Sequence, residues 1–283
     1  KKLKEAEKAY DKAILLKDNF AEPYEGRGDV LQELSKIDKD NKKFKLSIKN
    51  YEKALYLNKN LNYVMGKIVH SKQIINDWEN FDENLNIVLQ DTLNNKKSIE
   101  PFPLLSLIDD PEIHLTNSRK FSKNIASDLN NNIHKKISEN SIIKVGYFSA
   151  DFNEHAVSNL IFKMLSKHNK NKFKIYCYAF GFENKDNFHK AIENVVDIYR
   201  DIRDISDYNA ALLARKDGID IAIDLQGYTD KHRVNIFSNR AAPIQVNFLG
   251  YPGSMGADFI DYIIADKNLI PENKNNFYSE KII

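Results

Sequence analysis

The sequence predicts a protein in which α-helical repeats precede an α/β domain with a parallel, doubly wound sheet. The first 75 residues contain three Gly and one Pro, and they place apolar residues three and four positions apart, as amphipathic helices do. From Ile142 onward, short apolar runs rich in β-branched and aromatic residues alternate with helical segments. We therefore expect helical repeats over residues 1–75, a helical linker over 76–139 and the α/β domain over 140–283.

Composition narrows the class of protein. The 283 residues are 42% hydrophobic and 29% charged, which is typical of a globular chain. Lys and Arg number 42 against 40 Asp and Glu, so the net charge of +2 is too balanced for a dedicated nucleic-acid binder. No apolar run reaches the length of a membrane span. The single Cys177 excludes a disulfide framework, and we expect a cytoplasmic protein without nucleic-acid or membrane partners.

Internal similarity supports the helical repeats. Residues 9–16 (AYDKAILL) match residues 50–57 (NYEKALYL) at an offset of 41. This offset equals the tetratricopeptide (TPR) period of about 34 residues plus about seven inserted ones, most simply placed in 36–42. Each TPR unit has two helices. Ala6, Tyr10 and Ala13 match the small–aromatic–small pattern of the second helix of one unit, and Tyr24 and Gly28 match the aromatic and the small residue, four apart, in the first helix of the following unit. The alternative is a generic helical hairpin, and so short an array needs further repeats or a neighbouring domain to bury its core.

The linker should contain two helices and several breaks. Asn76 and Asp77 are candidate caps for a helix that carries Trp78 and Phe81 on one face. The prolines at 101, 103 and 111 predict breaks in the chain. A second helix is expected over 116–129, capped by Thr116 or Asn117, and a polar surface stretch follows within 130–140.

Strand and helix signals alternate through the last 140 residues. A helix beginning at Ser206 or Asp207 should end at Asp217-Gly218, because glycine commonly terminates helices. This alternation indicates a parallel sheet with helices on both faces. The expected strands cover residues 142–148, 173–180, 195–199, 219–225, 244–249 and 262–265, and the other expected helices cover 158–168 and 187–194.

Ligands of such sheets bind beyond the carboxyl ends of the strands, which directs attention to four loops. These are residues 149–157, 226–230 and 249–256 and the segment that starts at Asp266. The first places Asp151 and His155 four residues apart just before a helix, where a carboxylate can orient an imidazole and the helix start favours anions. The pair suits proton transfer or a phosphate-linked leaving group. The alternative is that His155 is a helix cap or a surface residue.

Loop 249–256 contains three glycines, so its backbone could approach a ligand closely or simply form a tight turn. Residues 145–149 carry one glycine where a dinucleotide fingerprint needs three, and Walker, HExxH and GxSxG motifs are absent from the sequence.

Three runs resemble the protein O-GlcNAc transferase family, which includes the SPINDLY-like, TPR-linked glycosyltransferases. They are VGYFSADF (145–152) with His155, DGIDI (217–221) leading to DLQGYT (224–229), and APIQVNFLGYPG (242–253). Residues 77–82, 258–266 and 278–281 extend the similarity over nearly the whole chain. Lys-rich and Asn-rich usage further suggests an AT-rich, bacterial genome.

The resemblance implies a GT-B fold, of which residues 140–283 would form the N-terminal Rossmann-like half. It implies inverting, metal-independent transfer of GlcNAc from UDP-GlcNAc to Ser or Thr hydroxyls of proteins that the repeats present, with no cofactor besides the donor. By matching position, Asp151 and His155 would lie at the reaction centre. The residues around the sugar would be Val157, Tyr228, Leu249, Gly250, Tyr251 and Pro252.

Two departures from the family pattern matter. Animal members carry further histidines before the first strand, whereas residues 101–105 (PFPLL) have none. The half that holds UDP should follow Ile283, so we expect a fragment of a longer chain, truncated at both ends and inactive alone. A transferase for another nucleotide sugar such as GDP-fucose, or a non-catalytic TPR scaffold, is the alternative.

Overall fold

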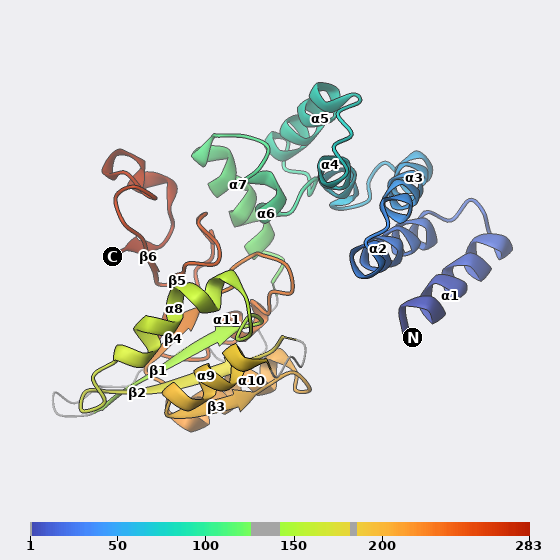
Figure 1. Cartoon of the computed structure of the whole chain (residues 1–283). Coiled ribbons are helices and arrows are strands. Elements are labelled where there is room, and N and C mark those ends of the chain that lie inside the picture. Colours follow the sequence, from blue (N-terminus) through green and yellow to red (C-terminus); the bar gives the residue numbers. More distant parts are fainter. Residues whose placement is uncertain (1, 126–141, 182–185) are drawn as a thin grey trace. The chain divides into compact units, whose positions relative to one another are not determined.

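The computed structural model describes residues 2–125, 142–181 and 186–283 of the chain (Figure 1). The chain divides into two compact units, Lys1–Ile113 and His114–Ile283, and the division falls inside the predicted linker. The first unit is helical and the second contains the sheet, as the sequence predicted. Residues 126–139 of the predicted linker, with its polar stretch, lie outside the described residues.

Consecutive helices pack against one another in the first unit. Helix α2 contacts α1 and α3, and α4 contacts α3 and α5. The bounds of these helices are α1 Lys2–Leu16, α2 Ala21–Asp38, α3 Asn41–Leu57, α4 Val64–Ile74, α5 Phe81–Leu93 and α6 Pro101–Leu104.

The two tyrosines at equivalent repeat positions each pack against a glycine of α2. A Cβ added to Gly26 would lie 2.4 Å from the ring of Tyr10, and one added to Gly28 would lie 2.4 Å from the ring of Tyr51. Tyr51 is fully buried. Each ring therefore occupies a volume that a side chain on α2 would need, Tyr10 from the preceding helix α1 and Tyr51 from the following helix α3.

The predicted insertion lengthens a helix and then ends it. Helix α2 continues to Asp38, and Lys39 adopts a left-handed conformation with φ 53°. The Asp40 side chain then accepts a hydrogen bond from the backbone N–H of Lys42 (2.9 Å) and caps α3.

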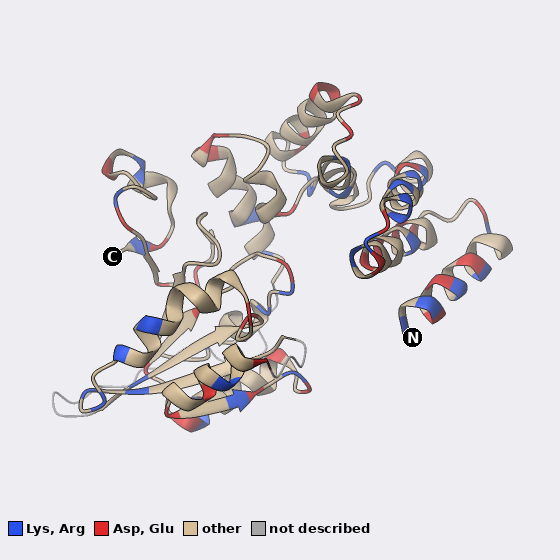
Figure 2. Cartoon of the chain, viewed as in Figure 1, with Lys and Arg blue, Asp and Glu red and all other residues tan. Residues whose placement is uncertain are grey.

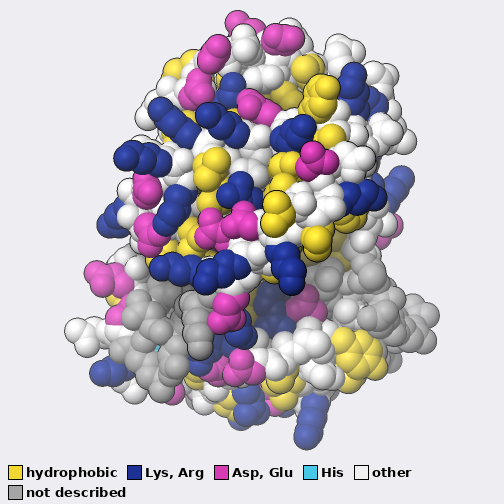
Figure 3. All heavy atoms as spheres, turned by 90° about the vertical axis from the view of Figure 1, so that its right-hand side faces the viewer, with side chains coloured by type: hydrophobic (Ala, Val, Ile, Leu, Met, Phe, Trp, Pro, Cys, Tyr) yellow, Lys and Arg dark blue, Asp and Glu magenta, His cyan; other side chains and the backbone are white. Residues whose placement is uncertain are grey.

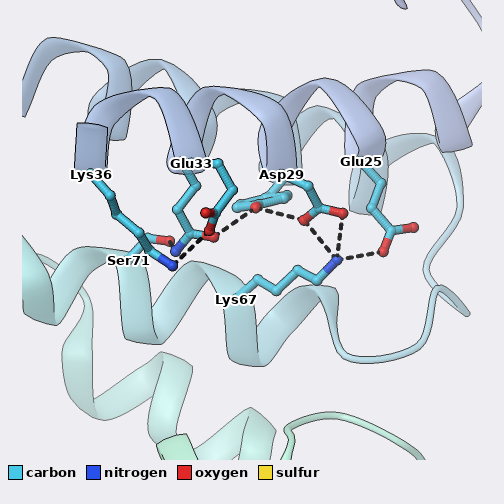
Figure 4. Close-up of polar contacts among 8 residues, drawn as sticks. Glu25, Asp29, Glu33, Lys36, Lys67 and Ser71 are labelled. Atoms are coloured by element: carbon cyan, nitrogen blue, oxygen red, sulfur yellow. Dashed lines mark hydrogen bonds and ion pairs between the residues drawn. The ribbon is translucent and has the colours of Figure 1, made fainter. Parts of the chain in front are cut away.

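A polar cluster joins α2, α3 and α4 (Figure 4). Lys67 Nζ of α4 lies 2.9 Å from Glu25 Oε1 and 2.8 Å from Asp29 Oδ1, and the Tyr51 hydroxyl donates to the same Asp29 oxygen at 2.8 Å. Burial opposes the charge on Lys67, but Asp29 and Glu25 outweigh it and raise the pKa of Lys67. The cluster therefore fixes the orientation of α4 within this unit.

The predicted caps of the linker helices were wrong. Helix α5 begins at Phe81, and Trp78 stands before it, 56% exposed, with its ring 5.3 Å from that of Phe81. Helix α7 spans Pro111–Ser122, so Thr116 and Asn117 lie inside it and residues 126–129 fall outside the described range.

Two of the prolines start helices where breaks were predicted. Pro101 stands at the first position of α6, and Pro111 starts α7. The Asp110 carboxylate accepts from the backbone N–H groups of Glu112 (3.0 Å) and Ile113 (3.2 Å). Proline is suited to this place because its missing N–H would have no partner in the first turn.

The second unit is built on one seven-stranded parallel sheet with the order β3-β2-β1-β4-β5-β6-β7. Its strands are β1 Ile143–Ser149, β2 Phe173–Ala179, β3 Ile198–Asp201, β4 Ile221–Asp224, β5 Ile244–Phe248, β6 Tyr262–Ile264 and β7 Lys281–Ile282. The other elements are helices α8 Ala156–Lys167, α9 Asn187–Val195, α10 Asp207–Asp217 and α11 Asn235–Ser238, and the 3-10 helix η1 Glu272–Phe277.

Both faces of the sheet are covered. On one face, Tyr147 and Ile223 belong to a buried cluster with Ile161 and Leu165 of α8. On the other, Phe148 stacks on Tyr178 at 4.4 Å and meets Phe237 of α11 edge-on at 5.3 Å. The chain is therefore doubly wound, as predicted.

The stronger sequence signals gave the more accurate bounds. Ser206 Oγ accepts from the N–H of Asn209 and Gly218 closes α10 with φ 73°, both as predicted. The third strand lies at 198–201 instead of 195–199, and α11, η1 and β7 had no prediction. These last elements have two to six residues, too few for a periodic pattern.

Basic and acidic residues are mixed along the chain (Figure 2), and they alternate over the face of the molecule that Figure 3 draws. This agrees with the net charge of +2. Within residues 2–125, 142–181 and 186–283, none of the helices has the length and apolar character needed to cross a membrane.

Candidate active site at the carboxyl edge of the sheet

The strand order creates one topological switch point. From β1 the chain proceeds outward through β2 and β3, and it then returns to place β4 on the other side of β1. The loops that follow β1 and β4 leave in opposite directions, which is where open parallel sheets bind ligands. The β1–α8 loop carries Asp151 and His155, and the β4–α11 loop carries Tyr228, so the fold brings two of the predicted segments to this edge.

Gln226 connects the two loops across the switch point. Its Oε1 accepts from the backbone N–H of Ala150 (3.2 Å) and lies 3.4 Å from Ser149 Oγ, while its Nε2 donates to the carbonyl of Asp230 (3.0 Å). Gln226 is 5% exposed, so these bonds replace water at a buried amide.

His155 is a helix cap, which was the alternative interpretation, and it also lies beside Asp151; its part in proton transfer stays a prediction. It is the N-cap of α8, with Nδ1 accepting from the backbone N–H of Val157 at 3.3 Å. The same Nδ1 lies 3.7 Å from Asp151 Oδ2, with side-chain exposures of 46% for His155 and 18% for Asp151. Because Nδ1 accepts from Val157, the neutral ring carries its hydrogen on Nε2. The edge thus presents a carboxylate beside an imidazole that can donate a hydrogen bond.

A neighbouring helix start holds this loop in place. Asp186, the N-cap of α9, accepts from the N–H of His189 and from that of Glu154, each at 2.7 Å. These backbone hydrogen bonds lower the pKa of Asp186. The β1–α8 loop therefore has fixed contacts on both sides, to Gln226 and to Asp186.

Glycines in the other two loops serve contact between protein backbones. A Cβ on Gly250 would lie 2.0 Å from the carbonyl oxygen of Leu225, and one on Gly227 would lie 2.3 Å from Cβ of Tyr251. Gly227 has φ 54°, and Leu249 also adopts a left-handed conformation with φ 70°. The loop after β5 therefore packs directly on the residue that follows β4. It also turns tightly, because the Gly250 N–H donates to the Phe248 carbonyl at 2.8 Å, as the alternative interpretation of this loop expected. Contact of this loop with a ligand stays a prediction.

Tyr228 and Tyr251 are internal supports. Tyr228 is 3% exposed and its hydroxyl donates to the carbonyl of Met255 (2.7 Å), while Tyr251 is 1% exposed with its hydroxyl 3.4 Å from Ser118 Oγ. Their rings meet edge-on at 5.4 Å, and burial raises the pKa of both phenols. They hold the loops together with hydroxyls that already have partners.

The remaining predicted residues are partly exposed at this edge. Val157 packs on the sheet core from α8, Leu249 packs on the same core, and the Pro252 carbonyl accepts from the Tyr278 hydroxyl at 3.0 Å. Like Gly250, each of them is part-exposed; that they border a ligand together with Asp151 and His155 stays a prediction.

Sequence reasoning missed several buried polar residues that position these loops. Glu280, 4% exposed, accepts from Ser254 Oγ (2.7 Å) and from the N–H of Met255. Asn247 Nδ2 donates to the Tyr251 carbonyl at 3.0 Å. The available signal was a polar residue inside an apolar strand, as in residues 244–248 (IQVNF), because a buried polar group must have a partner.

A doubly wound parallel sheet with polar side chains at its switch point is typical of α/β proteins that bind a ligand beyond the carboxyl ends of their strands. Residues 123–283 match the model of Glycosyl transferase family 41, and the chain therefore belongs to this family of glycosyltransferases.

Individual relatives agree with this family. The Arabidopsis thaliana protein named "Probable UDP-N-acetylglucosamine--peptide N-acetylglucosaminyltransferase SEC" is 30% identical over 232 residues, which are 76% of this chain and 24% of that protein. The Caenorhabditis elegans UDP-N-acetylglucosamine–peptide N-acetylglucosaminyltransferase is 37% identical over 141 residues, 50% of this chain and 12% of that protein. The chain thus spans a quarter or less of these relatives.

A solved structure shares the fold. A mutant O-GlcNAc transferase of Thermobaculum terrenum superposes with a TM-score of 0.72 at 20% identity, covering 98% of this chain and 53% of the other. This likeness supports helical repeats followed by one Rossmann-like half of a GT-B fold.

Proposed function

We propose that this chain contributes the repeat end and the acceptor-facing half of an inverting protein glycosyltransferase that uses UDP-GlcNAc. The observation that carries the proposal is the Asp151–His155 pair at the switch point of a family 41 sheet. The names of the relatives support the donor and the peptide acceptor.

In the proposed reaction, a Ser or Thr hydroxyl oxygen attacks the anomeric carbon of GlcNAc. The bond from that carbon to the UDP oxygen breaks, UDP leaves with the electron pair, and the hydroxyl proton passes to a base. His155, with hydrogen on Nε2, donates a hydrogen bond to a substrate oxygen. The Asp151 carboxylate stabilises the positive charge that develops on the sugar at its anomeric carbon as the bond to UDP breaks. The negative charge of the leaving diphosphate has to be stabilised by cationic and hydrogen-bond-donating groups, which the UDP-binding half of the family fold would supply.

Metal-independent transfer follows from the family resemblance and is part of the same proposal. Val157, Leu249, Gly250 and Pro252 would border the sugar, with Tyr228 and Tyr251 fixing their loops. The helical repeats would present the protein acceptor.

A donor assay tests the proposal. The protein as its gene encodes it is incubated with an acceptor lysate and either UDP-GlcNAc or GDP-fucose, and added sugar mass is read by mass spectrometry. Transfer from UDP-GlcNAc is expected, and Asp151→Asn should reduce it at least about 100-fold. Asp258→Asn is the matched control, since Asp258 is an exposed carboxylate of the same unit.

The outcomes separate the alternatives. Transfer from GDP-fucose alone would contradict the donor assignment, and transfer from neither sugar nucleotide would favour a scaffold. Equal rates for Asp151→Asn and Asp258→Asn would remove Asp151 from the reaction centre.

A further inference from the structure

Two buried oxygens on neighbouring strands have no hydrogen-bond partner among the described residues. They are Asp224 Oδ2 at the end of β4 and Asn247 Oδ1 in β5. Asp224 is 2% exposed and Asn247 fully buried. An orphaned buried acceptor is costly, and two of them on adjacent strands call for an explanation.

The strand register places these residues side by side. Asp224 and Asn247 are paired positions of the parallel strands β4 and β5. Paired residues of neighbouring strands project from the same face of a sheet, so the two side chains are immediate neighbours. Two acceptor oxygens repel each other unless one of them carries a proton.

The other polar atoms of each side chain are already engaged, and each holds a loop of the candidate site. Asp224 Oδ1 accepts from the N–H of Gln226 (2.9 Å) and of Gly227 (3.1 Å), which fixes the loop that carries Tyr228. Asn247 Nδ2 donates to the Tyr251 carbonyl, which fixes the loop that carries Gly250. A bond between the two side chains would therefore join both loops through the sheet.

We infer that Asp224 carries a proton in the folded protein and donates it from Oδ2 to Asn247 Oδ1, so that this pair positions the two loops. The bond gives each orphaned oxygen a partner and adds no charge to the interior. As positioning residues, the two act on the reaction through the loops, a link that rests on the proposed function. The proton itself does not depend on that function.

The surroundings of Asp224 favour its neutral form. Burial raises the pKa of Asp224 to about 6, against the lowering effect of its two backbone N–H partners. The nearby titratable groups are Tyr228, on which Asp224 acts, and Tyr251 and Glu280, which act on Tyr228; helix α11 carries none. A hydrogen bond that only the protonated form donates would raise the pKa of Asp224 further.

The test is a carbon-13 NMR titration of aspartate carboxyl groups in the full chain, with the Asp224 signal identified by its loss in Asp224→Asn. The proposal expects a midpoint well above the ordinary aspartate value of 3.8 that is lower in Asn247→Leu, which keeps the site buried but removes the acceptor. A midpoint near 3.8 in the natural sequence would overturn the inference, since Asp224 would then be charged in the folded protein. An unchanged midpoint in Asn247→Leu would overturn it as well.

Asp224→Asn offers a second measurement that does not require Asn247→Leu to fold. Its amide can donate permanently to Asn247 Oδ1 while its oxygen keeps the two backbone bonds. Because the folded pKa lies above the unfolded value, the natural protein should lose stability as the pH rises through the midpoint, and Asp224→Asn should not. If Asp224→Asn were less stable than the natural protein at every pH, the inferred hydrogen bond from protonated Asp224 to Asn247 would be contradicted. Loss of sugar transfer with an intact titration would fault only the proposed function.

Discussion

The two units of this chain specify their packing in different ways. In the helical unit, Tyr10 packs against Gly26 and Tyr51 against Gly28, and the two tyrosines lie in a repeat pattern visible in the sequence. In the sheet unit, Ala150 and Gln226 meet although they are far apart in the chain, because the strand order places β1 beside β4. The periodic sequence pattern therefore determines how the helices pack, whereas the order of the strands in the sheet determines which loops meet at the candidate site.

The largest effect should come from Gly250→Ala, which tests the topological contact. The new Cβ would lie 2.0 Å from the Leu225 carbonyl oxygen, and backbone cannot rotate away as a side chain does. We expect a loss of about 3 kcal/mol in the free energy of unfolding of the sheet unit, measured by urea denaturation.

Gly146→Ala is the matched control for that experiment. Its nearest contact, 3.0 Å to the Tyr178 ring, is a side chain of the same unit. If the two variants lose equal stability, the loop after β5 is not held against the end of β4.

Gly28→Ala applies the same change to the repeat. The Cβ would lie 2.4 Å from the buried Tyr51 ring, but alanine also favours the helix by about 1 kcal/mol. A net loss of about 1–2 kcal/mol is expected, confined to the helical unit. Hydrogen exchange of the backbone amides in each unit checks this. Reduced protection of the sheet strands in Gly28→Ala would contradict the expectation that the loss is confined to the helical unit.

Lys67→Met probes the polar cluster that fixes α4. It leaves Glu25 and Asp29 without their cation, and because these side chains are part-exposed we expect a loss of about 1–2 kcal/mol at pH 7. The pKa of Lys67 is raised, so its stabilising effect is present below the unfolded value of 10.5 and is lost as the pH rises further. Thermal melts at pH 7 and pH 11 should show the variant approaching the natural protein at the higher pH, and a constant difference would refute the ion-pair account.

The smallest effect is expected for Tyr228→Phe. The ring stays packed against Tyr251, and only the 2.7 Å bond to the Met255 carbonyl is lost. A decrease of about 1 kcal/mol in the free energy of unfolding should result, measurable by chemical denaturation. A variant as stable as the natural protein would show that this hydroxyl does not anchor the loop.

The sequence allowed the fold class, the strand–helix order and the Asp151–His155 pair to be predicted, because each leaves a local pattern. The starts of α5 and α7 were wrong, since Asn76 and Thr116 resemble caps while Asn80 and Asp110 occupy those places in space. Asp224, Asn247 and Glu280 were missed as anchors because their partners are backbone groups of loops whose paths only the folded sheet defines.

The central claim is that the switch-point edge is the transfer site, and His155 gives its most direct test. Asn at this position can still cap α8 but lacks the imidazole, whereas Ala removes both. In the protein as its gene encodes it, steady-state transfer from UDP-GlcNAc should fall at least about 100-fold in both His155→Asn and His155→Ala, with only His155→Ala losing about 1 kcal/mol of stability. Full transfer activity in a stable His155→Asn protein would contradict the claim.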